Sequence, residues 1–189
     1  MKKRLLILLV VPLLILNFAV VSWADSTLPK KKQTDLGLYV TAKEAFTKWH
    51  AEPNKIKILD VRTPCEYIFV GHAPMATNIP IEFFKDGIDL EKMKPVMLLN
   101  EKFVDEVKKK YKETDTILVM CRSGARSAVA VNKLAKAGFK NAYNVTDGFE
   151  GDKLHAEDSY NNGKRIVNGW KNSGASWTYK LDSTLVYLP

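Results

Sequence analysis

Short apolar runs alternate along most of the chain with longer stretches that have helical spacing. The runs at residues 55–61 and 116–120 predict strands, and the second run is apolar at every position after its first residue. A continuous run of this kind is expected of a strand that is buried on both faces, as in a parallel sheet. Shorter runs predict two further strands, at residues 76–80 and 141–145.

Helical spacing fills the intervals between these strands. Thr41, with Glu44 three residues later, has the pattern of a capping box and predicts the start of a helix after the apolar stretch 38–40. Residues 123–137 place their apolar side chains on one helical face, and Gly138 is a stop signal. The sequence also predicts a turn of helix at 64–70 and two helical stretches around Pro95, the second at 100–111.

The alternation of strands and helices predicts an α/β fold built on a parallel sheet. Ligands of such folds gather beyond the carboxyl ends of the strands. Cys121 directly follows the strand at 116–120 and therefore lies at such an end.

Composition and charge narrow the class of protein. The chain has 189 residues, of which 46% are hydrophobic and 26% charged, and this suits one compact domain. The formal net charge is +8, and three of the basic residues lie together at residues 2–4. This mild excess favours small anionic ligands, whereas the absence of a basic stripe interleaved with aromatic residues argues against a nucleic-acid partner.

The first 24 residues have the pattern of a secretory signal peptide. A basic start is followed by an apolar stretch at residues 5–21 and by the small residues of a cleavage site before Asp25. We therefore expect a periplasmic or secreted protein with a flexible lead-in at 25–36, a folded domain at 37–189 and no stable membrane insertion after cleavage. The alternative is an uncleaved membrane anchor, because the apolar stretch is near the lower length limit of a spanning helix.

The segment CRSGARS, residues 121–127, carries the candidate chemistry. A strand that turns directly into a helix points several backbone N–H groups at one spot, and the start of the helix adds partial positive charge there. Arg122 and Arg126 strengthen this field. We therefore expect Cys121 to be a nucleophilic thiolate near neutral pH. The alternative for a lone thiol after a strand is a buried core cysteine.

The length of this segment separates two kinds of chemistry. Tyrosine-phosphatase-like enzymes have five residues between cysteine and arginine, which makes a loop wide enough to surround a phosphate. Here four residues lie between Cys121 and Arg126. The tighter ring suits the single terminal sulfur of a persulfide and disfavours phosphatase or arsenate-reductase-like chemistry.

Four motifs together resemble the rhodanese (sulfurtransferase) family. They are DVRTPCEY at 60–67, GHAPMATNIP at 71–80, CRSGARS at 121–127 and GFEG at 148–151. Residues 168–181 further resemble the C-terminal part of exported single-domain rhodaneses, with an insertion at 152–167. The resemblance implies a rhodanese-like fold, with a five-stranded parallel sheet and helices on both faces.

The resemblance also implies a double displacement with no cofactor or metal. Cys121 takes a sulfane sulfur from thiosulfate or a related small anion and passes it to cyanide or a thiol acceptor. The backbone of the loop forms the substrate-binding cradle, which consists of Arg122, Ser123, Gly124, Ala125 and Arg126. The Arg122 side chain is expected to meet the anionic donor and the Arg126 side chain to brace the loop. Asp60 and Arg62 form either an ion-pair frame around the loop or a plain turn-stabilising pair.

Cys65 raises a redox question because the family often has glutamate there, and Met75 stands where glycine is usual. The chain has two cysteines, and in an exported protein these can form a disulfide. A fixed bond would consume the nucleophile, so we expect Cys65 to be a packed thiol. The alternative is a resolving thiol that attacks oxidised or persulfidated Cys121 and is then reset by an external reductant.

Other functions stay open as alternatives. A Cys–His protease would require a histidine beside Cys121, for which His72 is the candidate. The three histidines are not at metal-ligand spacing, so no metal site is expected. A non-catalytic persulfide carrier or binding module for a partner protein needs the same cradle as an enzyme, so the sequence does not separate the two.

Overall fold

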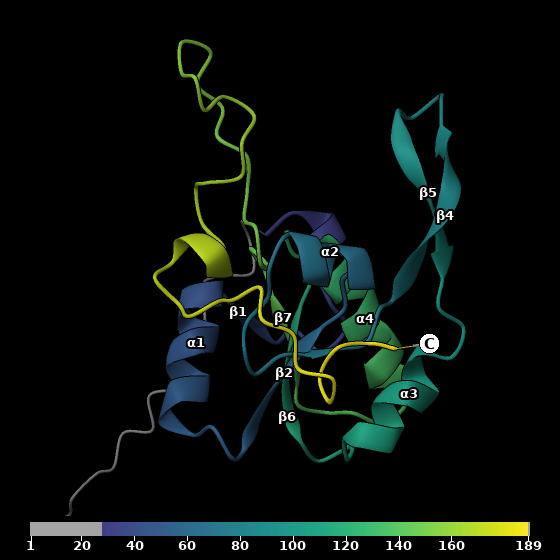
Figure 1. Cartoon of the computed structure of the whole chain (residues 1–189). Coiled ribbons are helices and arrows are strands. Elements are labelled where there is room, and N and C mark those ends of the chain that lie inside the picture. Colours follow the sequence, from purple (N-terminus) through teal and green to yellow (C-terminus); the bar gives the residue numbers. More distant parts are fainter. Residues whose placement is uncertain (1–27, 189) are drawn as a thin grey trace, which may run out of the picture.

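A computed structural model describes residues 28–188, and the expected signal peptide at 1–24 lies outside them. The described chain is built on a five-stranded parallel sheet with the strand order β1-β7-β6-β2-β3 (Figure 1). Its strands are β1 (Tyr39–Val40), β2 (Ile56–Asp60), β3 (Thr77–Asn78), β6 (Thr116–Met120) and β7 (Ala142–Val145). The expected α/β, rhodanese-like class and the five-stranded parallel sheet are confirmed.

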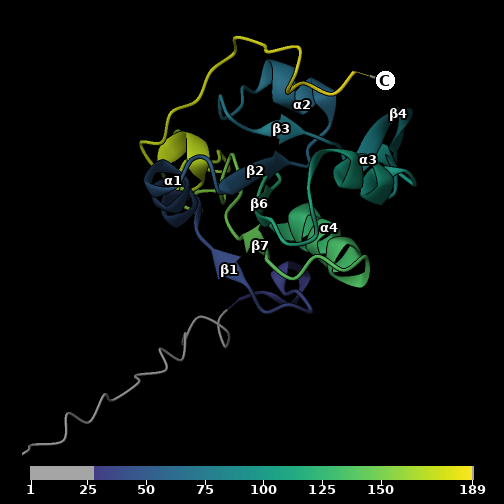
Figure 2. The ribbon, with the colours of Figure 1, turned by 90° about the horizontal axis from the view of Figure 1, so that it is seen from below.

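Helices cover both faces of this sheet, and Figure 2 shows α1 and α4 on opposite sides of it. The helices are α1 (Ala42–Ala51), α2 (Pro64–Phe69), α3 (Phe103–Lys110) and α4 (Ala125–Lys136), with short 3-10 helices η2 (Lys30–Lys32) and η3 (Trp170–Asn172). The capping box before α1 is confirmed, because Glu44 N–H donates to Thr41 Oγ1 and Thr41 N–H donates to Glu44 Oε2. The stop at Gly138 is also confirmed, since this residue follows α4 with φ 103°.

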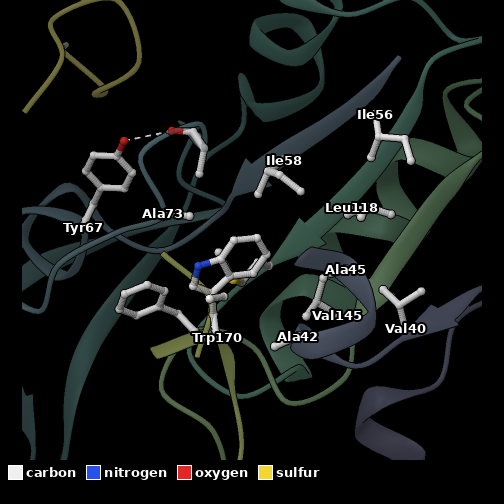
Figure 3. Packing of buried hydrophobic residues seen from close by; sticks show 14 residues of the cluster. Val40, Ala42, Ala45, Ile56, Ile58, Tyr67, Ala73, Leu118, Val145 and Trp170 are labelled. Carbon is white, nitrogen blue, oxygen red and sulfur yellow. Dashed lines mark hydrogen bonds between the residues drawn. The ribbon is translucent and has the colours of Figure 1, made fainter. Parts of the chain in front are cut away.

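The side chains of β6 alternate between two cores, as the period of a strand requires. Leu118 and Met120 join the cluster that contains Trp170 and the buried face of α1, which Figure 3 shows from close by. Ile117 and Val119 point to the other face and pack with α3 and α4. Both faces of β6 are buried, which explains its continuous apolar sequence.

The expectation of a helix before Pro95 is wrong. Residues on both sides of a turn form an antiparallel hairpin of β4 (Glu82–Asp89) and β5 (Lys94–Leu99), and Pro95 pairs with Ile88. Gly87 and Pro95 both disfavour a helix interior, whereas proline is tolerated where its nitrogen is not needed for a ladder hydrogen bond. The later helical stretch is confirmed as α3.

Part of the expected lead-in packs on the domain. Lys32 is buried, its carbonyl accepts a hydrogen bond from Asn144 Nδ2 at 2.8 Å, and its Nζ lies 3.2 Å from Asp152 Oδ1. Leu36 packs against the core cluster beneath α4. Lys32 and Leu36, within the expected lead-in, therefore contact the folded domain.

Two projections rise from the edge of the sheet where the parallel strands end (Figure 1). One is the β4–β5 hairpin, and the other is the arm formed by residues 152–167, the insertion expected from the sequence. Helix α2 lies between them in this view. Over residues 28–188, no helix has both the length and the apolar character needed to cross a membrane.

Candidate sulfur-binding loop

Cys121 begins the loop that joins β6 to α4, and only 1% of the residue is exposed. Val61, which follows β2, donates its N–H to Met120 O at 2.8 Å. Phe149, which follows β7, donates its N–H to Cys121 O at 2.7 Å. The start of the loop is therefore held between the segments that follow the two neighbouring strands.

The sulfur of Cys121 points into the loop. The Gly124 N–H donates to Sγ at 3.2 Å, and Ser127 Oγ lies 3.3 Å from Sγ. Gly124 has φ 93°, and a Cβ at this position would collide with the carbonyl of Thr146, so the loop requires glycine here. Helix α4 starts at Ala125 without a side-chain cap, so its first N–H groups remain available at the loop.

Asn144 stands behind the sulfur and orients Ser127. Asn144 Nδ2 donates to Lys32 O at 2.8 Å and to Gly124 O at 3.1 Å, which leaves Oδ1 to face Ser127 Oγ at 2.7 Å. The single hydroxyl proton of Ser127 can go either to Asn144 or to the sulfur. A thiolate at Cys121 draws this proton to Sγ, whereas a protonated thiol leaves it with Asn144.

The sequence interpretation missed the positioning role of this pair. Ser127 lies within the CRSGARS segment, directly after Arg126. This position could have indicated a hydroxyl close to the sulfur. In the sequence, Asn144 is an ordinary residue of a predicted strand. Only its polar side chain within that strand indicates that it has a buried hydrogen-bond partner.

Arg126 is held by a residue that the sequence interpretation also missed. Arg126 Nη1 and Nη2 donate to the two carboxylate oxygens of Glu66, at 2.8 and 2.6 Å. Glu66 is fixed in turn by a capping box with Thr63 at the start of α2. Both partners are largely buried, with 20% and 22% of their side chains exposed. Arg126 therefore ties the start of α4 to α2.

The Glu66–Arg126 pair strongly favours its charged forms. Burial opposes the charge of each partner, but the hydrogen bonds and the opposite charge outweigh it. The pKa of Glu66 is lowered to about 2, and the pKa of Arg126 is raised.

Asp60 and Arg62 are fully buried together at the end of β2. Arg62 Nη2 donates to Asp60 Oδ2 at 2.6 Å and to Gly71 O at 2.8 Å. The Arg62 guanidinium lies 4.1 Å from the centre of the Phe149 ring, and the backbone of Phe149 binds Cys121 O. The pair also closes its own turn, because Arg62 N–H donates to Asp60 Oδ1. The contact with Phe149 fits an ion-pair frame around the loop, and the contact within the turn fits a turn-stabilising pair.

Comparison with known proteins agrees with this geometry. A family model described as the rhodanese-like domain matches residues 43–155, which is more than half of the chain. The chain belongs to the rhodanese-like domain family.

Relatives and solved structures agree with this assignment. The chain is 33% identical over 128 residues to uncharacterized protein RP600 of Rickettsia prowazekii, covering 67% of this chain and 85% of that protein. It is 34% identical over 93 residues to thiosulfate sulfurtransferase 16, chloroplastic, of Arabidopsis thaliana, covering 49% of this chain and 70% of that protein. The crystal structure of Rv0390 from M. tuberculosis matches with a TM-score of 0.59 and 28% identity, covering 75% of this chain and 96% of that one.

Some relatives are longer than the region they share with this rhodanese-like chain. The match covers 46% of the senescence-associated protein DIN1 of Raphanus sativus and 42% of RC0915 of Rickettsia conorii. Family membership therefore describes this domain, and the sulfurtransferase family is the level of function that the comparisons support.

Two side chains of this rhodanese-like domain, Cys65 and His72, are not among the hydrogen-bond partners of the sulfur. Cys65 is free and exposed, so the expectation of a packed thiol is wrong, although neither cysteine forms a disulfide. Cys65 precedes the buried Tyr67 by two positions on α2, and such residues point to opposite sides of a helix. His72 stacks on Tyr67 at 3.9 Å, and its ring nitrogens face the carbonyls of Tyr67 and Lys180. These contacts give His72 a packing role.

Arg122 is exposed at the mouth of the rhodanese loop. Its carbonyl accepts N–H groups from Glu150 at 3.0 Å and Gly151 at 3.3 Å, whereas its side chain donates to no other residue in the range 28–188. The same range contains no group of three or more side chains suited to hold a metal ion.

We expect Glu66→Gln to reduce stability in a pH-dependent way. The folded pKa of Glu66, about 2, lies below its ordinary value of 4.5, so the ion pair stabilises the fold above pH 4.5 and is lost as the pH falls toward 2. The loss in unfolding free energy on substitution should be about 2 to 3 kcal/mol at pH 7 and should shrink toward pH 2. Urea unfolding across this range measures it.

Glu113→Gln is the matched control for this prediction. It breaks the exposed Lys108–Glu113 pair, which is worth less than about 1 kcal/mol. An equal loss in both variants, or a Glu66→Gln loss that grows toward pH 2, would contradict the prediction.

Proposed function

We propose that the protein is a thiosulfate sulfurtransferase-like enzyme that carries a sulfane sulfur as a persulfide on Cys121. The observation that carries this proposal is the closed loop around the sulfur, in which the Gly124 N–H and the Ser127 hydroxyl lie 3.2 and 3.3 Å from Sγ. A thiolate and a persulfide anion are both stabilised by such donors and by the start of α4.

The first half of the reaction loads the sulfur. The Cys121 thiolate attacks the outer sulfur of thiosulfate or a related anion, forms a new S–S bond, and releases sulfite with the electron pair of the broken S–S bond. Arg122 is exposed at the mouth of the loop and is free to meet the negative charge of the donor. Arg126 is occupied by Glu66 and acts by holding the loop in shape.

The second half of the reaction unloads the sulfur. Cyanide or a thiolate attacks the outer sulfur of the persulfide, and the Cys121 thiolate leaves with the electron pair. The donors around Sγ then stabilise the returning thiolate. The charges balance in both halves, so the cycle needs no cofactor, metal or external oxidant.

The size of the loop favours this chemistry over phosphate chemistry. Four residues separate Cys121 from Arg126, and the Gly124 N–H is already bound to Sγ. A loop of this size suits one added sulfur atom. A non-catalytic carrier of a persulfide for a partner protein would use the same loop and is the second candidate function.

Intact mass spectrometry tests the loading step. After incubation with thiosulfate, the wild-type protein should gain one sulfur atom, and peptide mapping should place it on Cys121. Cyanide should then remove the sulfur and release thiocyanate repeatedly. A single release without turnover would favour the carrier, and sulfur found only on Cys65 would contradict both functions.

A further inference from the structure

The arm at residues 152–167 is a fixed part of the domain. The two chain segments that form the arm pair near its base. Leu154 N–H donates to Lys164 O at 2.8 Å, and Lys153 forms an isolated β-bridge with Arg165. Asn172 holds the base, because its Nδ2 group lies 3.1 Å from Glu150 O and 3.2 Å from Arg165 O. Side chains on the lower part of the arm therefore keep a defined place above the domain.

A cavity of about 480 Å³ lies between the base of this arm, the end of α2 and η3. Four cationic side chains and one carboxylate, Glu150, line it; the cations are Lys153, Lys164, Arg165 and Lys171. Cavities of this size hold small molecules. The excess of positive charge favours an anionic one.

Three of the four cations of this cavity are oriented by hydrogen bonds that do not neutralise their charge. Arg165 donates to Gly151 O, Lys164 to Asn161 Oδ1 and Lys171 to Val70 O, all of which are uncharged acceptors. In the part of the chain that the structure describes, none of the four has a carboxylate within 4.0 Å.

Asp152, at the base of the arm, makes its hydrogen bonds to residues outside the cavity lining. Asp152 lies beside Lys32 at 3.2 Å and accepts a hydrogen bond from Asn168 at 3.1 Å. Asp152 also interacts electrostatically with Arg165, and the three lysines of the lining keep the excess of positive charge available for a ligand.

The lining of the cavity is hydrogen-bonded to the sulfur-binding loop. Glu150 lines the cavity, and its N–H donates to the carbonyl of Arg122, the residue after Cys121. Val70 lines the cavity at the end of α2, the helix whose Glu66 holds Arg126. The residues that line the cavity are therefore joined through Glu150 to the loop that carries the nucleophile.

We propose that this cavity binds the carboxylate groups of a small acidic thiol, which accepts the sulfur from Cys121. This inference rests on the proposed function. Ammonium and guanidinium groups bind carboxylates through charge-assisted hydrogen bonds, which hold the acceptor beside the loop. The acceptor thiolate then attacks the outer sulfur of the persulfide, the acceptor leaves as a persulfide, and Cys121 returns to its thiolate.

The rates at which two different thiols remove the sulfur from persulfide-loaded Cys121 test the site. Persulfide-loaded protein is mixed with mercaptosuccinate, which has two carboxylates, or with 2-mercaptoethanol, which has none. In the double variant Lys153→Gln/Lys164→Gln, the rate constant for mercaptosuccinate at low concentration should fall about five- to tenfold, and that for 2-mercaptoethanol should not change. Both lysines are exposed, so the fold should tolerate the change.

The control removes the same charge elsewhere. Lys109 and Lys136 are exposed on α3 and α4, outside the lining of this cavity. Lys109→Gln/Lys136→Gln should leave both rates within about twofold of wild type. Equal losses in the two double variants, or equal losses with the two thiols, would overturn the inference.

A binding measurement separates this inference from the proposed function. Succinate has no thiol, so calorimetric titration into Cys121→Ser protein reports the cavity without sulfur chemistry. Succinate should bind, and the Lys153→Gln/Lys164→Gln change should weaken binding about five- to tenfold. Lysine-dependent binding of succinate, combined with wild-type protein that gains no sulfur from thiosulfate, would support the cavity and contradict the proposed function. Sulfur loading with no lysine-dependent binding would overturn the cavity alone.

Discussion

Cys121→Ser should lower sulfur transfer from thiosulfate to cyanide by at least about a thousandfold while the protein stays folded. A serine hydroxyl remains protonated at any pH where the thiolate exists, so neither half of the reaction can proceed. The smaller Oγ still faces the Gly124 N–H, so the free energy of unfolding should change by less than about 2 kcal/mol. Steady-state thiocyanate release and urea unfolding measure the two effects.

The second cysteine provides the matched control for this experiment. Cys65 is free and exposed on α2, and none of the hydrogen bonds around Sγ involves it. Cys65→Ser should keep wild-type turnover without added reductant. Substantial turnover in Cys121→Ser would contradict the assignment of the nucleophile, and a reductant requirement that disappears in Cys65→Ser would revive the resolving role.

Gly124→Ala should remove most transfer activity and destabilise the domain by about 3 kcal/mol or more. Alanine has to adopt φ 93°, which costs about 1 to 2 kcal/mol, and its Cβ collides with the backbone carbonyl of Thr146. Because Thr146 follows the buried strand β7, the loop has to move, and the Gly124 N–H then leaves Sγ. Thermal unfolding and the rate of persulfide formation report the two losses.

Gly37→Ala is the control that separates the cost of backbone strain from the cost of the collision with Thr146. Gly37 has φ 62°, and a Cβ there meets nothing within 4 Å. Gly37→Ala should therefore cost only the backbone strain and leave sulfur transfer near the wild-type rate. Equal effects of the two substitutions would show that contact with Thr146 does not shape the loop.

The sequence by itself determined the features that depend on neighbouring residues. Thr41 and Glu44 form the expected capping box because both partners lie in one helical turn. A continuous apolar run predicted the strand at 116–120, and the helical period of the apolar positions predicted the helix after it, since burial of both sheet faces and of one helix face imposes these two patterns. The position of Cys121 between these two elements followed directly, and four motifs identified the family.

The hairpin shows where local rules are insufficient. Spacing around Pro95 suggested a helix, but β4 and β5 pair with each other across a turn, and their ladder satisfies the backbone groups that a helix would have satisfied. Exposure of Cys65 is a similar case, because it depends on which face of α2 meets the core. Both outcomes depend on partners that a local pattern does not contain.

Only the tertiary structure decided which residues support the sulfur. Glu66 and Arg126 are 60 positions apart, and Asn144 and Lys32 are 112 positions apart, yet each pair makes a direct hydrogen bond. The insertion at 152–167 was visible as a segment, but its cationic cavity exists only because the base of the arm lies beside the end of α2. A sequence specifies local preferences strongly, whereas these contacts arise from packing that sums many weak long-range interactions. Export stays a prediction of the sequence.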